Sequence, residues 1–231
     1  MIERRVFDIF CFPGKSLSYV TRRLCLCLAF LVGLQFSGQV RGQQVKDSDR
    51  LGMALDYFKS GKYHEALLLF EQLDKTYKLN PRFHAYMGLC YYQEWDYEHA
   101  VGMFDGALPQ LSSLSPHELS VYYYARAESL FSLGKYDTAL ADYEHVLTLC
   151  YDKEKADCYY RIGFCLMQKN EWSNAAEALT SALAYYRQYL NTPDHYARIR
   201  QTENMLKGCK AKAKTDTIQN KGTRKSPLDS K

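Results

Sequence analysis

A pattern that occurs four times along the chain constrains the fold more than any other feature of the sequence. Each copy begins with a small residue, has an aromatic residue or leucine three positions later, and then contains a turn. An aromatic residue follows the turn, an alanine comes three positions after it, and a large apolar residue lies four positions beyond the alanine. The copies begin at Ala54, Gly88, Ala127 and Gly163, and their alanines (Ala66, Ala100, Ala139 and Ala175) are 34, 39 and 36 residues apart.

The spacing within each copy predicts a helical hairpin. Apolar residues recur with the period of a helix, as in Ala139, Tyr143 and Val146. Gly61 and Gly134 lie where the first helix of a copy should end. The small residue allows the two helix backbones to approach closely, and the aromatic residue after the turn packs back across the pair. A single hairpin cannot bury its apolar face, so the copies are expected to stack into a solenoid.

These residues resemble the tetratricopeptide repeat family, whose helix–turn–helix unit of about 34 residues has the same order of small, aromatic, alanine and large apolar positions. The resemblance covers residues 47–190. It implies an all-α fold, a right-handed superhelical solenoid of about four repeats within residues 43–190. It also implies that the protein binds other proteins.

The third copy departs from the regular spacing. About five extra residues around Pro109–Ser115 precede it, and we expect them to form a longer surface loop. Ser115 then has the position of a helix N-cap, Pro116 follows in the first turn, and Glu118 lies three residues after the cap. A new helix is therefore predicted to begin here.

One further helix is predicted after the fourth copy, within residues 191–213. Tyr196, Ile199 and Met205 have the spacing to cover the last hairpin, while Arg198 and Lys207 face water. Terminal units of a solenoid need such a polar outer face. Residues 214–231 lack aromatic residues and periodicity, and are predicted to be a disordered basic tail.

Residues 1–42 have the pattern of a secretory signal peptide. Eleven uncharged residues, Leu24–Leu34, follow Arg22 and Arg23. A membrane-spanning helix needs about 20 apolar residues, so this run is short for a span. The small residues around Arg41 predict cleavage before Gln43, which leaves no stable membrane span. An uncleaved anchor and a buried helix are the alternatives, and translation could also begin near Val20.

The distribution of charge argues against a nucleic-acid-binding protein. Residues 43–206 contain 16 basic and 22 acidic side chains, whereas residues 207–231 contain eight basic and two acidic ones. A protein that coats nucleic acid would be basic throughout, and the basic tail has no aromatic residues to stack on bases. The tail is expected to be solvated, with contact to anionic lipid or phosphate as the alternative.

No sequence motif indicates catalysis or a cofactor. The zinc-helix, nucleophile-elbow, dinucleotide and phosphate-loop patterns do not occur. The histidines are expected at helix starts or outer faces, and carboxylates such as Glu71, Asp142 and Glu177 at exposed positions. The sequence therefore predicts a protein that is not an enzyme and needs no cofactor.

Five cysteines lie beyond residue 42. Cys90 and Cys165 have equivalent positions inside helices and are expected to be small buried apolar residues. Cys150 and Cys158 flank the connection between the third and fourth copies. An oxidising compartment would permit a disulfide between them, with two free thiols as the alternative. An odd total leaves at least one thiol free.

The first helices of the four copies are expected to line the inner, concave face of the solenoid. Positions i, i+4 and i+7 of each helix give a groove that is apolar and aromatic apart from one carboxylate. Such a groove suits an apolar peptide or helix of a partner rather than an acidic C-terminus. The alternative is that these side chains pack internally or are covered by the C-terminal helix. The predicted groove residues are Leu51, Leu55, Phe58, Ala85, Leu89, Tyr92, Tyr124, Glu128, Phe131, Tyr160, Phe164 and Met167.

The sequence thus predicts an exported adaptor that binds a segment of another protein in its groove. If the source is bacterial, we expect the protein in the periplasm or cell envelope, and otherwise in the secreted fraction. The alternative function is a structural envelope component that acts through self-association and contact of its tail with anionic surfaces.

Overall fold

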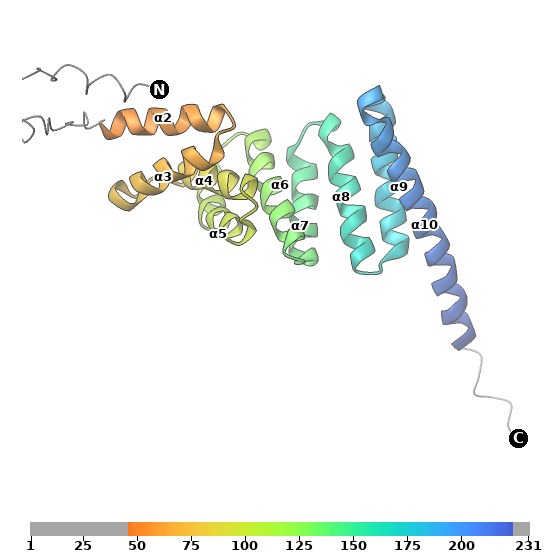
Figure 1. Cartoon of the computed structure of the whole chain (residues 1–231). Helices are drawn as coiled ribbons and strands as arrows, with labels where there is room; N and C mark the ends of the chain where they lie inside the picture. Colours follow the sequence, from red (N-terminus) through yellow and green to blue (C-terminus); the bar gives the residue numbers. More distant parts are fainter. Residues whose placement is uncertain (1–45, 224–231) are drawn as a thin grey trace, which may run out of the picture. The chain divides into compact units, whose positions relative to one another are not determined.

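The computed structural model describes residues 46–223, and this part of the chain is helical, without strands (Figure 1). The predicted all-α class is confirmed. The helices are α2 (Asp47–Lys59), α3 (Tyr63–Tyr77), α4 (Pro81–Gln93), α5 (Tyr97–Ala107), α6 (Pro116–Ser132), α7 (Tyr136–Leu149), α8 (Lys155–Gln168), α9 (Trp172–Tyr189) and α10 (Pro193–Thr223), with short 3-10 helices η1 (Leu108–Gln110) and η2 (Asp152–Glu154).

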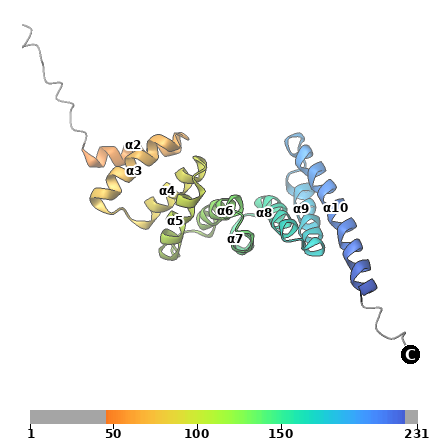
Figure 2. The same ribbon diagram turned by 60° about the horizontal axis from the view of Figure 1, so that its bottom comes forward.

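The eight helices α2 to α9 form four consecutive hairpins, one for each copy of the sequence pattern. The aromatic residue after each turn is the first residue of the second helix: Tyr63, Tyr97, Tyr136 and Trp172. Each hairpin packs against the next along the chain, and α10 packs against α9. Figure 2 shows these pairs in chain order. This is the predicted solenoid of tetratricopeptide type with a capping helix.

The four hairpin turns share one backbone conformation. In each, the residue two before the second helix has a positive φ: Gly61 and Gly134 at 73°, Trp95 at 63° and Asn170 at 62°. The amide of the following residue donates a hydrogen bond to the carbonyl five positions earlier in the chain. Examples are Lys62 to Tyr57 and Asp96 to Tyr91, both at 2.9 Å. This left-handed closure satisfies carbonyls at the end of the first helix.

The small residue of each copy makes the close approach that the sequence predicts. A Cβ atom on Gly88 would lie 2.9 Å from Cε1 of Phe104, and one on Gly163 would lie 2.8 Å from Cγ of Leu179. Ala100, on the second helix of its hairpin, is completely buried. The buried residues form three clusters, which join α2 to α4, α4 to α6, and α5 to α10, so apolar packing continues from one hairpin to the next.

The segment before the third hairpin is mostly exposed, as predicted for a surface loop, but Leu111 within it is buried. Residues Leu108–Gln110 form η1, and the side chains of Leu108 and Leu111 are buried in the cluster between α4 and α6. Burial of these two leucines between α4, α5 and α6 removes apolar area from water, so the connection packs onto the two hairpins that it joins. Ser115 caps α6 as predicted, because its hydroxyl accepts a hydrogen bond from the Glu118 amide.

The C-terminal helix is longer than predicted. It was expected to end at residue 213 before a disordered tail, but α10 continues to Thr223. Between Cys209 and Lys221 the sequence contains neither glycine nor proline, so nothing interrupts the helical hydrogen bonds before Gly222. The predicted signal peptide, residues 1–42, lies outside the described residues. Within those residues, no helix has the length and apolar character to cross a bilayer.

Candidate partner-binding face

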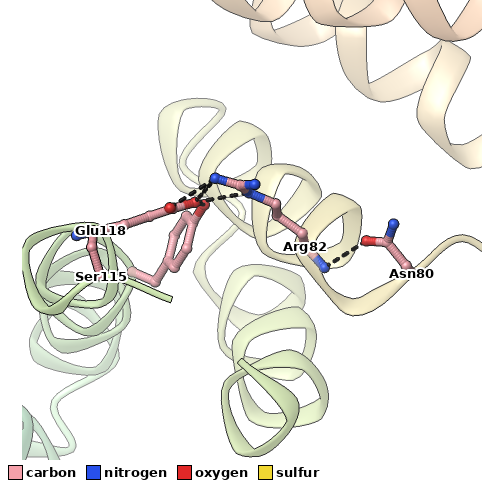
Figure 3. Close-up of polar contacts among 5 residues, drawn as sticks. Asn80, Arg82, Ser115 and Glu118 are labelled. Carbon is pink, nitrogen blue, oxygen red and sulfur yellow. Dashed lines mark hydrogen bonds and ion pairs between the residues drawn. The ribbon is translucent and has the colours of Figure 1, made fainter. Parts of the chain in front are cut away.

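Polar contacts at their N-terminal ends hold the first helices of the second and third hairpins together (Figure 3). Arg82 on α4 donates from Nε and Nη2 to the two carboxylate oxygens of Glu118 on α6, at 2.9 and 2.7 Å. The hydroxyl of Tyr122 donates to the same carboxylate at 2.9 Å. Asn80 caps α4 by accepting from the Arg82 amide. The bidentate geometry fixes both the distance and the relative orientation of the two helices.

Aromatic contacts join each first helix to the first helix of the next hairpin. Phe58 on α2 stacks on Tyr86 of α4 with ring centroids 4.9 Å apart. Tyr86 also lies 6.4 Å from Tyr122 on α6. Phe131 on α6 meets Phe164 on α8 edge to face at 5.4 Å. One face of each first helix therefore lies beside the same face of the next, as the predicted groove requires.

The predicted groove residues divide into two groups by exposure. Ala85, Glu128 and Tyr160 are buried, at 0%, 7% and 3% exposure. The other nine are only half-buried, so the stripe along α2, α4, α6 and α8 (the inner face) offers apolar and aromatic surface to a partner. These nine are Leu51, Leu55, Phe58, Leu89, Tyr92, Tyr124, Phe131, Phe164 and Met167.

A buried ion pair lies below the middle of the inner face. Nη2 of Arg161 on α8 is 2.5 Å from Oε2 of Glu128 on α6. The hydroxyl of Tyr143 on α7 donates to Oε1 of Glu128, also at 2.5 Å. The Glu128 side chain is 8% exposed and that of Arg161 is 30% exposed. One carboxylate thus joins three helices from two hairpins.

Burial and charge set the ionisation of this cluster. Loss of hydration raises the pKa of Glu128, and the nearby Arg161 opposes that rise. Burial acts against the charge of Arg161, but Glu128 beside it raises the pKa of the guanidinium overall. Burial, reinforced by the charge of Glu128, also raises the pKa of Tyr92 and Tyr124. The inner face therefore presents neutral phenols above a compensated ion pair.

The sequence analysis missed Arg161 and Tyr143, although a signal for the cluster was present. Leu55, Leu89 and Phe164 have the position in their copies that Glu128 has in the third. Similarly, Phe70, Phe104 and Leu179 correspond to Tyr143. Only the third copy has a polar residue at both of these repeat positions, Glu128 at one and Tyr143 at the other. A buried carboxylate requires a hydrogen-bond donor such as the Tyr143 hydroxyl.

The C-terminal helix covers part of the inner face. The guanidinium of Arg198 on α10 lies over the ring of Tyr160, 4.5 Å from its centroid, which explains why Tyr160 is buried. Outside the inner face, Lys212 of α10 lies 3.8 Å above the ring centroid of Trp172 at the start of α9. Of the two alternatives for this face, coverage by α10 thus applies at Tyr160, whereas Phe164 on the same helix stays half-buried.

The cysteines lie as the sequence predicts, and Cys150 and Cys158 share one pocket. Cys90 and Cys165 are completely buried. Cys150 is half-buried and Cys158 is buried, both are free thiols, and both line a pocket of about 280 Å³ between α6, α7 and α8. A hydrogen bond from Cys158 lowers the pKa of Cys150, whereas that bond and burial raise the pKa of Cys158. The predicted disulfide remains a prediction.

One carboxylate that the sequence placed on the surface is buried. Asp142 on α7 is 6% exposed, because Arg126 on α6 donates to both of its oxygens at 2.7 Å. Arg126 also reaches Asp105 on α5 at 2.9 Å. These ion pairs join three helices, so Asp142 has a structural contact in this part of the chain. Among residues 46–223, no group of histidine, cysteine and carboxylate side chains has the geometry of a metal site.

Comparisons with known proteins agree with this architecture. Residues 51–116 and 157–189 each match a family model for the tetratricopeptide repeat. No curated protein matches the sequence significantly.

Solved structures with the same fold include MamA of strain AMB-1, at a TM-score of 0.56 and 13% identity, covering 79% of this chain and 94% of that one. MamA residues 41 to the end from Desulfovibrio magneticus RS-1 give 0.53 and 18%, covering 78% and 97%. The APC/C hetero-tetramer Cut9–Hcn1 gives 0.55 and 16%, covering 71% of this chain and 30% of that one. At these identities the likeness concerns the fold alone. The chain thus carries tetratricopeptide repeats, and its described residues fold as a solenoid of that type.

Proposed function

We propose that this protein is an exported, non-enzymatic adaptor that binds a segment of a partner protein along its inner face. The observation that carries the proposal is the row of nine half-buried apolar and aromatic side chains on four successive first helices. Packing between hairpins requires apolar side chains only at positions that a neighbouring hairpin covers. Here they continue across four hairpins on one face, which is the arrangement that an extended or helical peptide requires.

The chemistry of the face favours an apolar partner segment. Leu51, Leu55 and Ala85 are apolar and add no positive charge that would bind an acidic peptide. Glu128 is compensated by Arg161, so the centre of the face has little net charge. The phenol groups of Tyr92 and Tyr124 remain protonated and can form hydrogen bonds with a peptide backbone. The partner is therefore expected to bind through apolar side chains and backbone groups.

Two kinds of comparison support a scaffold function. The tetratricopeptide fold typically serves protein–protein interaction rather than catalysis, although a fold alone does not fix function. Cut9, one of the structures with this fold, occurs in a hetero-tetramer with Hcn1. Assembly with another polypeptide is accordingly the function that the inner face supports best.

The test compares partner capture by three proteins in extracts of the source organism. Tyr92→Ala with Phe131→Ala removes two central aromatic side chains and should weaken capture at least tenfold, since such anchors each contribute ~2 kcal/mol. We prefer Tyr92 to Tyr124, because Tyr124 packs edge-on against Tyr143 beside the buried ion pair. The control, Leu68→Ala with Tyr189→Ala, truncates exposed side chains on second helices and should leave capture unchanged.

Melting temperatures distinguish binding from folding. If the double variant unfolds, Leu55→Lys provides a second test, because its long side chain can reach water from a half-buried position. Folded variants that capture the same partners as the wild type would contradict binding at the inner face.

Export is the second part of the proposal, and it rests on the pattern of residues 1–42. The intact mass of protein purified from its natural source should correspond to a chain that begins at Gln43. A mass that retains Leu24–Leu34 would show that the segment is not removed.

A further inference from the structure

The pocket of about 280 Å³ between α6, α7 and α8 (the inter-hairpin pocket) is continuous with the inner face. Tyr124, one of the inner-face residues on α6, lines this pocket, and so does Asp157 on α8. Asp157 lies seven residues before Phe164, so the two share the side of α8 that forms the inner face. Cys158 in the wall is buried, whereas Val121 is exposed. The pocket is therefore open toward the surface that is proposed to bind a partner.

The inter-hairpin pocket lies at a repeat position that an arginine side chain occupies one hairpin earlier. Counted from the small residue of each copy, Val121 has the position in the third hairpin that Arg82 has in the second, six residues before it. Likewise, Glu154 has the position in the fourth hairpin that Glu118 has in the third, nine residues before it. Arg82 donates from Nε and Nη2 to Glu118 (Figure 3). At the next boundary the acceptor carboxylate is present without the arginine, and Val121 and Glu154 both line the pocket.

The walls of the pocket suit a basic side chain with an apolar stem. Valine side chains and the ring of Tyr124 form apolar walls, against which methylene groups can pack. Glu154 and Asp157 contribute two carboxylates, whereas no lysine or arginine of the described residues lines the pocket. Lys153 and Lys155 are close in sequence but lie outside it, and Lys155 forms an ion pair with another carboxylate at 2.7 Å. The lining thus complements a cation.

Both carboxylates can accept further hydrogen bonds. The hydroxyl of Tyr186 donates to Oδ1 of Asp157 at 2.5 Å, and Oδ2 has no hydrogen-bond or ion-pair partner among residues 46–223. Nε2 of His117 lies 3.1 Å from Oε1 of Glu154, and each oxygen of a carboxylate can accept two hydrogen bonds. A guanidinium group in the pocket would therefore find acceptors that no side chain of the described residues uses.

We propose that the inter-hairpin pocket binds an arginine side chain of the partner segment, an inference that rests on the proposed function of the inner face. The guanidinium donates to Glu154, as that of Arg82 donates to Glu118, and to Oδ2 of Asp157. Its stem packs against Tyr124. Arginine fits better than lysine, because its planar fork matches two carboxylate acceptors. The partner segment is thus apolar with one basic anchor, and this anchor sets the register of the segment along the inner face.

Alkylation of Cys150 measures whether the pocket is filled. Cys150 lines the pocket and is half-buried, whereas the other cysteines of the described residues are buried. Iodoacetamide is uncharged, and peptide mass spectrometry gives its rate at this thiol in the reduced mature chain. Nα-acetylarginine amide should slow that rate saturably. Nα-acetylcitrulline amide and Nα-acetylnorleucine amide, which have the same backbone without the charge, should not slow it at equal ionic strength.

Removal of both carboxylate charges should abolish the protection by the arginine probe. Glu154→Gln with Asp157→Asn keeps an acceptor oxygen for His117 and Tyr186, so the variant should fold. The matched control, Glu65→Gln with Glu144→Gln, removes the same charge from exposed positions on second helices, and the probe should protect it as it protects the wild type. The pocket variant should also capture the partner about tenfold more weakly than this control, because hydrogen bonds between charged groups are lost.

Val121→Arg provides a second variant, because it should fill the pocket from within the chain. The new guanidinium has the repeat position of Arg82 and can pair with Glu154. Cys150 should then react slowly without any probe, and partner capture should weaken. Val121→Met, which adds a long uncharged side chain, is the matched control and should protect Cys150 less. Addition of Glu154→Gln to Val121→Arg should restore the reactivity of the thiol.

Four results would overturn the proposal: no protection by the arginine probe, equal protection by an uncharged probe, protection that persists in the pocket variant, or a folded pocket variant that captures the partner as the control does. The variant Tyr92→Ala with Phe131→Ala keeps this separate from the proposed function, since neither residue lines the pocket. If only that variant loses capture, the inner face binds the partner without an arginine anchor. If neither variant loses capture, the proposed function is wrong as well.

Discussion

Arg161 of the fourth hairpin lies 2.5 Å from Glu128 of the third, and this pair joins two repeats that are 33 residues apart in sequence. Tyr143 completes the hydrogen bonding of the carboxylate. A buried ion pair adds little net stability compared with apolar residues of the same size, but loss of one partner leaves an uncompensated charge. The consequences of this asymmetry can be measured.

Arg161→Met should lower the free energy of unfolding by about 3–5 kcal/mol, because Glu128 stays buried without its counter-charge. The triple variant Glu128→Leu with Tyr143→Phe and Arg161→Met, which makes the site apolar as in the other repeats, should be close to the wild type in stability. Urea unfolding measures both. Equal destabilisation of the single and triple variants would contradict the asymmetry.

The stability of the wild type should depend on pH through Glu128. Burial raises the pKa of this carboxyl in the folded state above its ordinary 4.5. Between these two values the folded state holds a proton that the unfolded state has lost. The contribution of Glu128 is therefore fully present below pH 4.5 and is lost as pH rises through the folded pKa.

Urea unfolding from pH 4.5 to 7 should show this loss for the wild type and its absence for Glu128→Gln. The destabilisation by Arg161→Met should decrease at acid pH, because protonation of Glu128 removes the unpaired charge. A carboxyl-carbon NMR titration that gives Glu128 a pKa below 4.5 in the wild type would contradict the first expectation, and a destabilisation by Arg161→Met that stays constant between pH 7 and 4.5 would contradict the second.

Gly88→Ala should destabilise the second hairpin by about 1–3 kcal/mol, because the new Cβ atom would lie 2.9 Å from the Phe104 ring. The matched control is Gly102→Ala in α5, where no atom outside the local backbone lies within 4 Å. That change should stabilise the protein by up to about 1 kcal/mol through helix propensity. Calorimetric melting that shows the same sign for both variants would mean that the hairpin packing differs from the structure.

Trp95→Gly should raise the melting temperature. Trp95 adopts a φ of 63° at the turn position where the first and third hairpins have glycine, and its side chain is 79% exposed. The substitution removes a left-handed strain of about 1–2 kcal/mol and loses little packing. Gly134→Ala, the reverse change in the third hairpin, should lower the melting temperature. A lower melting temperature for Trp95→Gly would indicate that the indole ring makes a stabilising contact.

Oxidised glutathione should convert Cys150 and Cys158 into a disulfide, with the two electrons and two protons passing to the glutathione. The lowered pKa of Cys150 makes it the attacking thiolate. Closure of this short loop should raise the free energy of unfolding by about 2–3 kcal/mol. Mass spectrometry should show a loss of two hydrogens located in a peptide that links α7 to α8. Alkylation of both thiols after oxidation would contradict the prediction.

The sequence by itself determined the local structure of this protein. Small, aromatic and alanine positions at fixed spacing placed the four hairpins, and the Ser115 cap and the turn glycines placed helix ends. Each of these features depends on contacts between residues that are close in sequence, so the pattern of one segment is enough to place its helices and helix ends. The periodicity also proposed the positions of the inner face, because side chains seven residues apart share one side of a helix.

Only the tertiary structure decided which of those positions a partner can reach. Tyr160 is buried because Arg198 of α10 covers it, and Glu128 is buried because Arg161 and Tyr143 satisfy its charge and hydrogen bonds. Leu111, within the predicted surface loop, is buried in the cluster between α4 and α6. In each case the burial of a side chain depends on contact between segments that are distant in sequence. The stabilising apolar burial, hydrogen bonds and ion pairs form between these segments, so the sequence pattern of one segment does not reveal them.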